Sequence, residues 1–289
     1  MPRLIYSLLF YLTQPAVWLR LWWRARKQPE YLRHVGERYG HYPQPAPPYL
    51  LWLHVVSVGE TRAAEPLIKA LLEAYPDHSL LLTHMTPTGR ATGGELIAKY
   101  GPRLLQAYLP YDLPGPCRRF FGHFRPRLGL LMETELWPNL IASAHGCNAP
   151  VLLVNARLSQ RSQRGYLRFA PLIRPALQQL TGVAAQTPAD GERLAAIGAQ
   201  RVSVLGNIKF DVTPSPEKLE LGKQWRQTLG ARKIWLAAST REGEEAIILD
   251  AFTRLDRPDL LLLLVPRHPQ RFAEVAALVE QRGLALCRR

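Results

Sequence analysis

The chain has 289 residues, 47% of them hydrophobic, which is enough for one large or two medium domains with their own cores. It carries 37 Lys and Arg against 23 Asp and Glu, a net charge of +14, which favours an anionic partner such as nucleic acid, an acidic lipid surface or a phosphorylated substrate. Its three cysteines are widely spaced and no CxxC or HExxH motif occurs, so neither a disulfide framework nor a zinc site is indicated, and a reducing compartment fits best.

The amino-terminal segment is apolar and aromatic over residues 4–23, with a basic flank at 24–33. Its length is near the ~20 residues of a membrane-spanning helix, although Gln14-Pro15 interrupts it. A signal peptide would need a small-residue cleavage site, which the segment lacks, and a core helix of the folded domain is the other alternative. The aromatic residues and basic flank match an interfacial anchor whose flank faces the cytoplasm. We predict a membrane anchor helix over 1–27 and a Pro-rich linker over 28–49.

From residue 50 onward, short apolar runs alternate with helical patterns. The predicted strands are Leu50–Val56, Leu80–His84, Leu104–Tyr108, Leu128–Met132, Val151–Asn155, Gly182–Ala185 and Val202–Leu205. The predicted helices are Ala64–Tyr75, Thr88–Tyr100, Gly115–Phe121, Pro138–His145, Pro171–Leu180 and Ala189–Ile197, with Gly59–Ala63 as loop because Pro66 fits only a first helical turn. Such alternation implies βαβ units and a mainly parallel sheet, so residues 50–212 are predicted to form a Rossmann-like lobe.

A proline-containing hinge at Asp211–Pro216 precedes a second alternation. Strands are predicted at Lys233–Ala237 and Leu260–Val265, between helical patterns. The last residues, Ala285–Arg289, have the pattern of a further strand. Two strands and a fragment would leave apolar edges unpaired, so we predict that residues 213–289 are an incomplete second Rossmann-like lobe.

One carboxylate directly follows the first predicted strand. Glu60 lies in Ser57–Thr61, SVGET, a glycine turn between that strand and a helix. In open α/β sheets, ligands bind at the carboxyl ends of the strands. Glu60 is therefore either a glutamate that complements the helix dipole, contributing ~0.3–1 kcal/mol, or a general base for a hydroxyl nucleophile.

A second strand end carries two more carboxylates. Glu133 and Glu135 lie in METELWPN, straight after a predicted strand. They are either a capping pair before a proline-started helix or part of one crevice with Glu60, since both strands have the same strand-end geometry. Lys209, in GNIKFD beside the hinge, is either an exposed linker lysine or a cation that meets a phosphate or carboxylate between the lobes.

The strand ends of the second lobe predict a nucleotide site. Ser239 and Thr240 precede a run of glutamates, the pattern of a helix N-cap, and helix amino termini at strand ends also bind phosphates. Pro266 and Arg267 end the next strand with a fixed turn and a guanidinium. The chain has no GxGxxG or Walker motif, and its basic residues are not interleaved with aromatics as in single-strand nucleic-acid binders. No nucleic acid is therefore expected as a partner.

A resemblance to a known family rests on motifs that occur in this order: HVVSVGET, LTHMTPTG, YLPYDLP, METELWPNLI, NARLSQRS, GNIKFD, STREGEE and LVPRHPQRF. They closely resemble the bacterial 3-deoxy-D-manno-octulosonic acid (Kdo) transferases, which move Kdo from CMP-Kdo to the lipid A precursor. The amino-terminal LIYSLLFYLTQP and its basic flank resemble the membrane anchor of that family. The resemblance covers essentially the whole chain and implies a GT-B fold, in which two Rossmann-like lobes face one cleft.

The resemblance also implies roles for single residues. Glu60 matches the family's catalytic base, and Glu133 and Lys209 match residues regarded as transition-state stabilisers. The Pro266-Arg267 pair matches the family's CMP-binding pair. Arg241 stands where many relatives have histidine, and the family's Met-Gly-Glu loop and Asn-Pro-Leu-Glu stretch, which bind CMP, are absent. We therefore expect a chain truncated within its donor lobe.

The predicted function is transfer of Kdo from CMP-Kdo to the lipid A precursor in lipopolysaccharide biosynthesis, at the cytoplasmic face of the anionic inner membrane. Glu60 would take the proton from a sugar hydroxyl, and direct displacement at the anomeric carbon implies inversion. Arg267, Lys209 and helix amino termini would balance the charge of the leaving CMP; no metal and no other cofactor is expected. The alternative is a catalytically inactive fragment that acts as a membrane-associated lipid or sugar-phosphate binding protein.

Overall fold

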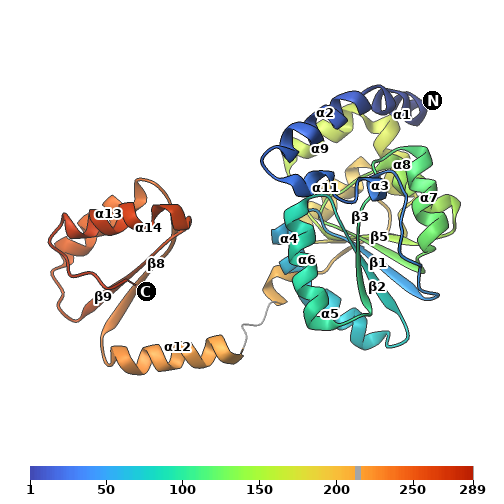
Figure 1. The fold of residues 1–289 in the computed structure, drawn as a ribbon. Coiled ribbons are helices and arrows are strands. Elements are labelled where there is room, and N and C mark those ends of the chain that lie inside the picture. Colours follow the sequence, from blue (N-terminus) through green and yellow to red (C-terminus); the bar gives the residue numbers. More distant parts are fainter. Residues whose placement is uncertain (212–215, 289) are drawn as a thin grey trace. The chain divides into compact units, whose positions relative to one another are not determined.

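The computed structural model describes residues 1–211 and 216–288 and divides the chain into two compact units, Met1–Val212 and Thr213–Arg289 (Figure 1). The first unit contains a parallel sheet of seven strands in the order β3-β2-β1-β4-β5-β6-β7. The strands are β1 Leu50–His54, β2 Ser79–His84, β3 Leu104–Tyr108, β4 Leu128–Met132, β5 Val151–Ala156, β6 Gly182–Ala185 and β7 Val202–Val204. Helices connect successive strands, as parallel pairing requires, which confirms the predicted α/β class.

The helices of the first unit begin at residues suited to a helix start. Proline opens α6, α7, α8 and α11, in the first turn, where its missing N–H leaves no helical hydrogen bond unmade. Side chains of Ser or Thr accept a backbone N–H at the N-caps of α4, α6, α9 and α11. The elements after α2 are η1 Pro29–Leu32, α3 Val35–Arg38, α4 Val58–Ala63, α5 Glu65–Ala74, α6 Pro87–Tyr100, α7 Pro114–Phe124, α8 Pro138–Gly146, α9 Gln160–Arg168, α10 Ala170–Gln178, α11 Pro188–Ile197 and η2 Ile208–Asp211.

The loop predicted at Gly59–Ala63 is helical in the structure, so that prediction is wrong. It assumed one helix beginning just before Pro66. Instead α4 and α5 are separate helices, and Pro66 lies in the first turn of α5, where it is tolerated. Ser57 caps α4, and Glu60 is thereby held in the first turn of a helix instead of a loop.

Strand β1 lies in the middle of the sheet and is buried on both faces. Trp52 packs with the phenylalanines of α7 on one face, whereas Leu51 and Leu53 belong to the cluster on the other face with Ile68 of α5. Burial on both faces explains why the first four residues of β1 are apolar; the fifth, His54, is a buried polar residue. Gly129 of β4 leaves room for the indole ring, because a Cβ there would lie 2.5 Å from a Trp52 ring atom.

The amino-terminal segment forms two helices, α1 Pro2–Leu12 and α2 Gln14–Ala25, where one anchor helix over 1–27 was predicted. The break falls at Thr13, directly before the first turn of α2, which contains Pro15 and starts a new helix there. Helix α1 packs against α8 and α10, and the Ser7 hydroxyl donates to Asn139 Oδ1 at 3.1 Å. Among the described residues, no helix is both long and apolar enough to span a membrane.

The second unit contains a two-stranded parallel sheet, β8 Lys233–Thr240 and β9 Leu260–Pro266, in its described residues. These strands correspond to the two that were predicted there. The other elements are α12 Pro216–Leu229, α13 Glu244–Leu255, η3 Pro269–Arg271 and α14 Phe272–Glu280. A buried ion pair joins α13 to η3, because both carboxylate oxygens of Glu245 accept from the Arg271 guanidinium at 2.7 and 3.1 Å.

Two buried histidines predict that the stability of the first unit depends on pH. His54 and His84 are fully buried, and burial lowers the pKa of each to about 3, assisted at His84 by the charges of His54 and Arg90. In the unfolded chain, each histidine binds a proton below its ordinary pKa of about 6.5. In the folded chain, each stays neutral until the pH falls to about 3. Between pH 6.5 and about 3, each histidine therefore lowers the free energy of unfolding as pH falls, by about 1.4 kcal/mol per pH unit.

The measurement is urea unfolding at several pH values below 6.5, for the wild type and His84→Gln. We expect a slope against pH that is shallower in the variant by about 1.4 kcal/mol per unit. Because buried carboxylates contribute equally to both proteins, the difference in slope isolates His84 even if the variant is less stable. Equal slopes would contradict the prediction.

Candidate active site

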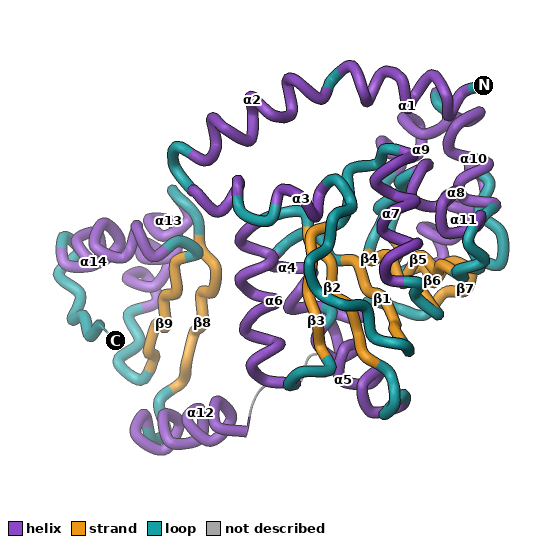
Figure 2. The backbone as a smooth tube through the Cα atoms, turned by 45° about the vertical axis from the view of Figure 1, so that its right-hand side comes forward, coloured by secondary structure: helices purple, strands orange, loops and turns teal. Residues whose placement is uncertain are grey.

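The candidate site lies where the strand order of the first sheet reverses. The chain builds β1, β2 and β3 outward in one direction and then returns to place β4 on the other side of β1, and Figure 2 shows β1 and β4 side by side. At such a switch point, the connections leave the two neighbouring strand ends in opposite directions and open a crevice. Glu60 follows β1, and Glu133 and Glu135 follow β4, so three carboxylates lie at this point.

Hydrogen bonds on both carboxylate oxygens hold Glu60. The backbone N–H of Val56 donates to Oε2 at 2.8 Å, and the Ser57 hydroxyl donates to Oε1 at 2.9 Å. Ser57 is also the N-cap of α4 and Glu60 its third residue, so the pair forms a close variant of the capping box. Glu60 thus lies in the first turn of a helix, the position that the structural alternative from the sequence assumed, and the two hydrogen bonds orient its carboxylate.

The protonation of Glu60 reflects competing surroundings. Burial raises the pKa of Glu60 above its ordinary value, while the bonds from Val56 and Ser57 lower it. The negative charge of Glu133 raises this pKa further, and the positive charge of Lys209 lowers it. These electrostatic interactions show that the three predicted residues of the first unit lie close enough to influence one another. A carboxylate with a raised pKa is a better proton acceptor when ionised.

Lys209 reaches the carboxylates from η2, after the last strand. Its ammonium lies 3.4 Å from Glu133 Oε1, with both side chains partly exposed. Asn155, at the end of β5, fixes this approach because its Oδ1 accepts the N–H of Ile208 at 3.2 Å. This contact joins residues 53 positions apart in the chain, so no local sequence pattern predicts it.

Backbone strain marks the same sheet edge. Glu133 has φ 57° and Asn155 has φ 52°, a left-handed conformation that is uncommon for residues other than glycine. Glu133 remains tied to the neighbouring strand, because its N–H donates to the Val154 carbonyl at 2.9 Å. Residues held in sparsely populated conformations occur preferentially at functional sites, which supports the assignment of a site to the ends of β4 and β5.

Glu135 is the residue of this site with the largest change in acidity. From the sequence it was either part of a capping pair or part of one crevice with Glu60, and the family resemblance gave it no role. Burial, and then the charges of Glu60 and Glu133, raise the pKa of Glu135 to about 7. Tyr166 of α9 lies near the same carboxylate. Burial raises the pKa of its phenol, and the negative charge of Glu135 raises it further. The negative charge of Glu60 thus favours the protonated form of Glu135.

The predicted residues of the second unit meet at the ends of its two strands. Arg267 N–H donates to the Thr240 carbonyl at 3.0 Å, and Thr240 pairs in register with Pro266. The Thr240 hydroxyl donates to Glu245 at 2.8 Å, so its role is to support the buried ion pair of this unit. Of the four predicted residues, Ser239 and Arg267 are exposed. Their side chains are therefore the ones that can contact a ligand.

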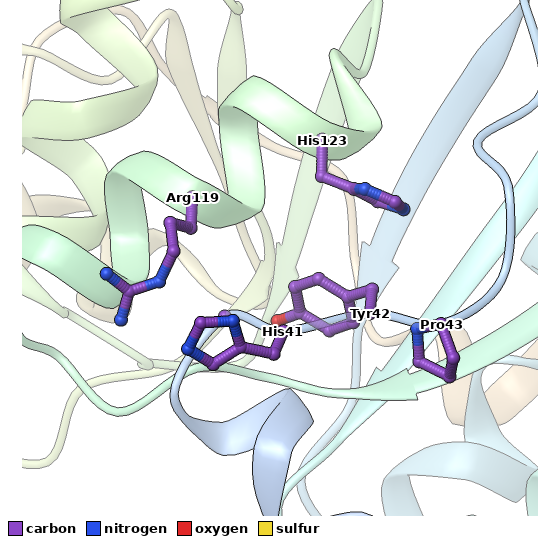
Figure 3. A pocket seen from close by; sticks show the side chains of 6 residues that line it. His41, Tyr42, Pro43, Arg119 and His123 are labelled. Atoms are coloured by element: carbon purple, nitrogen blue, oxygen red, sulfur yellow. The ribbon is translucent and has the colours of Figure 1, made fainter.

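A separate pocket of about 500 Å³ lies beside α7 and is lined by Gly40, His41, Tyr42, Pro43, Arg119 and His123 (Figure 3). Its polar side chains serve the adjacent loop: Arg119 donates to the Tyr39 carbonyl at 2.6 Å, and a ring nitrogen of His123 lies 2.9 Å from the Gln44 carbonyl. Over residues 1–211 and 216–288, no group of three His, Cys, Asp or Glu side chains is placed to hold a metal ion.

The chain is similar to known proteins of one family. Residues 33–212 match the family described as "3-Deoxy-D-manno-octulosonic-acid transferase (kdotransferase)". The chain is 44% identical over 301 residues to the 3-deoxy-D-manno-octulosonic acid transferase of Bordetella pertussis, covering 100% of this chain and 69% of that protein. It is 38% identical over 297 residues to the enzyme of the same name from Haemophilus influenzae, covering 99% of this chain and 68% of that protein.

A solved structure shares the fold at low sequence identity. UDP-GlcNAc 2-epimerase from Neisseria meningitidis, solved with UDP-GlcNAc bound, matches 82% of this chain and 70% of its own chain with a TM-score of 0.57 and 17% identity. At this identity the likeness concerns the fold alone. It agrees with the α/β architecture built on a parallel sheet that the chain displays.

Proposed function

The chain belongs to the 3-deoxy-D-manno-octulosonic acid (Kdo) transferase family, and from this premise we propose that it transfers Kdo from CMP-Kdo to a hydroxyl of the lipid A precursor. The observation that carries the proposal is the gathering of Glu60, Glu133, Glu135 and Lys209 at the switch point of the sheet. Such a gathering provides both a proton acceptor and a cation at one place, as a glycosyl transfer to a hydroxyl requires.

Glu60 is the general base of the proposed reaction. Its carboxylate, held by Val56 and Ser57, accepts the proton of the acceptor hydroxyl as the oxygen attacks the anomeric carbon of Kdo. The bond from that carbon to the CMP phosphate oxygen breaks, and the electron pair leaves with CMP. One displacement from the side opposite to CMP inverts the configuration at the anomeric carbon.

The surrounding charges stabilise this displacement. Lys209 favours the ionised form of Glu60 and offers a positive charge to the acidic groups of the reactants. Glu133 fixes the Lys209 ammonium through their ion pair. In the second unit, Ser239 and Arg267 are proposed to bind CMP, with Pro266 and Thr240 shaping the strand ends that present them.

Membrane association is the second element of the proposal. Helix α1 exposes a stripe of large apolar side chains at Leu4, Ile5, Leu8, Leu9 and Leu12. Helix α2 exposes Trp18, Leu19, Trp22 and Trp23 and ends in a basic segment. Apolar and aromatic residues beside basic ones are typical of helices that lie in the membrane interface. We propose that α1 and α2 rest on the cytoplasmic face of the inner membrane, where a lipid acceptor is accessible.

The test is release of CMP from CMP-Kdo by the purified chain, with and without a lipid A precursor in mixed micelles. We expect release that depends on the acceptor and a product with inverted anomeric configuration by NMR. A folded chain that binds the lipid precursor and releases no CMP would instead support the alternative, a lipid or sugar-phosphate binding protein.

A further inference from the structure

Helix α9 has an unbalanced positive charge. Its sequence, QRSQRGYLR, contains three arginines and no acidic residue. Arg161, Arg164 and Arg168 are all exposed, and their spacing of three and four residues places them on one face of the helix. Within the described part of the first unit, none of the three forms an ion pair. This face is therefore available to an anionic partner.

Apolar side chains project beside these arginines, where α9 meets α10. Leu167 is 45% exposed, and Phe169, the residue between the two helices, is 64% exposed. Moving such side chains from water into an apolar medium is favourable. We define the α9–α10 elbow as Arg161, Arg164, Leu167, Arg168 and Phe169.

The elbow shares a flank with the amino-terminal helices. Helix α10 packs against both α9 and α1, and Figure 1 shows α9 on the same side of the sheet as α1 and α2. The flank that carries the exposed apolar stripe of α1 thus also carries the α9–α10 elbow, which combines basic and apolar side chains. Two separate contacts on one flank would fix the orientation of the unit on a surface. A single helix pair would leave the unit freer to tilt.

The opposite face of α9 turns toward the carboxylate site. Tyr166 lies about half a turn from the arginines at 3.6 residues per turn, and its hydroxyl donates to the Thr134 carbonyl at 3.5 Å, between Glu133 and Glu135. One helix, about 10–12 Å across with its side chains, therefore separates the arginine face from the carboxylates. A surface bound to the elbow would lie close to the site.

We propose that the α9–α10 elbow is a second contact with an anionic lipid bilayer, distinct from α1 and α2, which sets the carboxylate site at a fixed small distance from the lipid surface. The proposal rests on the membrane association in the proposed function. Arginines would bind lipid phosphates while Phe169 and Leu167 enter the interface. A nucleic acid would match the arginines but not the apolar tip, so a bilayer fits both features.

The experiment measures co-sedimentation of the full chain with vesicles of phosphatidylcholine containing or lacking phosphatidylglycerol. The elbow variant carries Arg161→Gln, Arg164→Gln and Arg168→Gln. The matched control carries Arg118→Gln, Arg125→Gln and Arg201→Gln, three exposed arginines of the same unit outside the elbow, so both variants lose the same net charge. We expect the elbow variant to bind the anionic vesicles at least tenfold more weakly than the control.

A second pair of variants tests the apolar tip. Phe169→Ser should weaken binding to anionic vesicles several-fold, whereas Tyr75→Ser, at a residue 44% exposed on α5's end, should not. Circular dichroism and the thermal midpoint check that all four variants fold. Equal binding by the elbow variant and its control, with Phe169→Ser matching Tyr75→Ser, would overturn the proposal. Because no sugar donor is present, this outcome is independent of whether the chain transfers Kdo.

Discussion

Replacing Glu60 with glutamine is expected to lower the rate of Kdo transfer by about 10²–10⁴-fold, the usual contribution of a positioned general base. Glutamine preserves the shape of the side chain and can still accept the N–H of Val56 through its amide oxygen, a bond that Glu60 makes at 2.8 Å. The cap of α4 should therefore survive, and only the ability to accept a proton is lost. The measurement is acceptor-dependent CMP release at saturating donor.

The control for this variant is Glu95→Gln, at an exposed glutamate of α6, which should retain wild-type turnover. Thermal midpoints of both variants should stay close to that of the wild type. An E60Q protein that is clearly less stable and proportionally less active would favour a purely structural role in the cap. A stable and inactive one would favour the base.

Replacing Lys209 with methionine is expected to have the second large effect on the rate of transfer. Removing a preorganised charge from a site of charge development typically costs about 10²–10³-fold in turnover. Its stability cost should be small, because the Lys209–Glu133 pair is partly exposed. The positive charge of Lys209 also lowers the pKa of Glu60, so its loss raises that pKa. The acidic limb of the activity profile should then move to higher pH, since Glu60 must be ionised to act.

Lys69→Met is the matched control for this experiment. Lys69 is an exposed lysine of α5 that also pairs with a glutamate, Glu73, at 3.8 Å, but it takes no part in the site. Its replacement should leave both turnover and the acidic limb unchanged. A Lys209→Met protein with a normal acidic limb would refute the electrostatic role of Lys209, whatever its turnover.

The sheet of the first unit was predictable because its strands are apolar runs that stop at turn residues. β1 and β4 are buried on both faces, and His54, at the end of β1, is the one polar side chain in the two strands, so each reads as a nearly continuous apolar run. The position of the site depends on the order of the strands in the sheet, and only the structure shows that order. The sequence could place Glu60 and Glu133 at strand ends but could not say that β1 and β4 are neighbours.

Other features depend on tertiary surroundings and were not predictable. The acidity of Glu135 arises from burial and from Glu60, which lies 75 positions earlier in the chain, and no local pattern records such an interaction. The helix α4 was missed because the pattern around Pro66 permits one helix or two. In the amino-terminal segment, Gln14-Pro15 signalled the interruption that the structure places at Thr13. Composition could not reveal the attachment of α1 through Ser7 and Asn139.

The central claim, that Glu60 is the base of a glycosyl transfer, is tested most directly by the pH dependence of acceptor-dependent CMP release in the wild type and E60Q. For the wild type we expect a loss of activity at low pH with an apparent pKa above 4.5, the ordinary value for glutamate. For E60Q we expect at least about a hundredfold lower rate at pH values where Glu60 is ionised in the wild type, without recovery at high pH. A folded E60Q protein with the wild-type rate and the same acidic limb would contradict the claim.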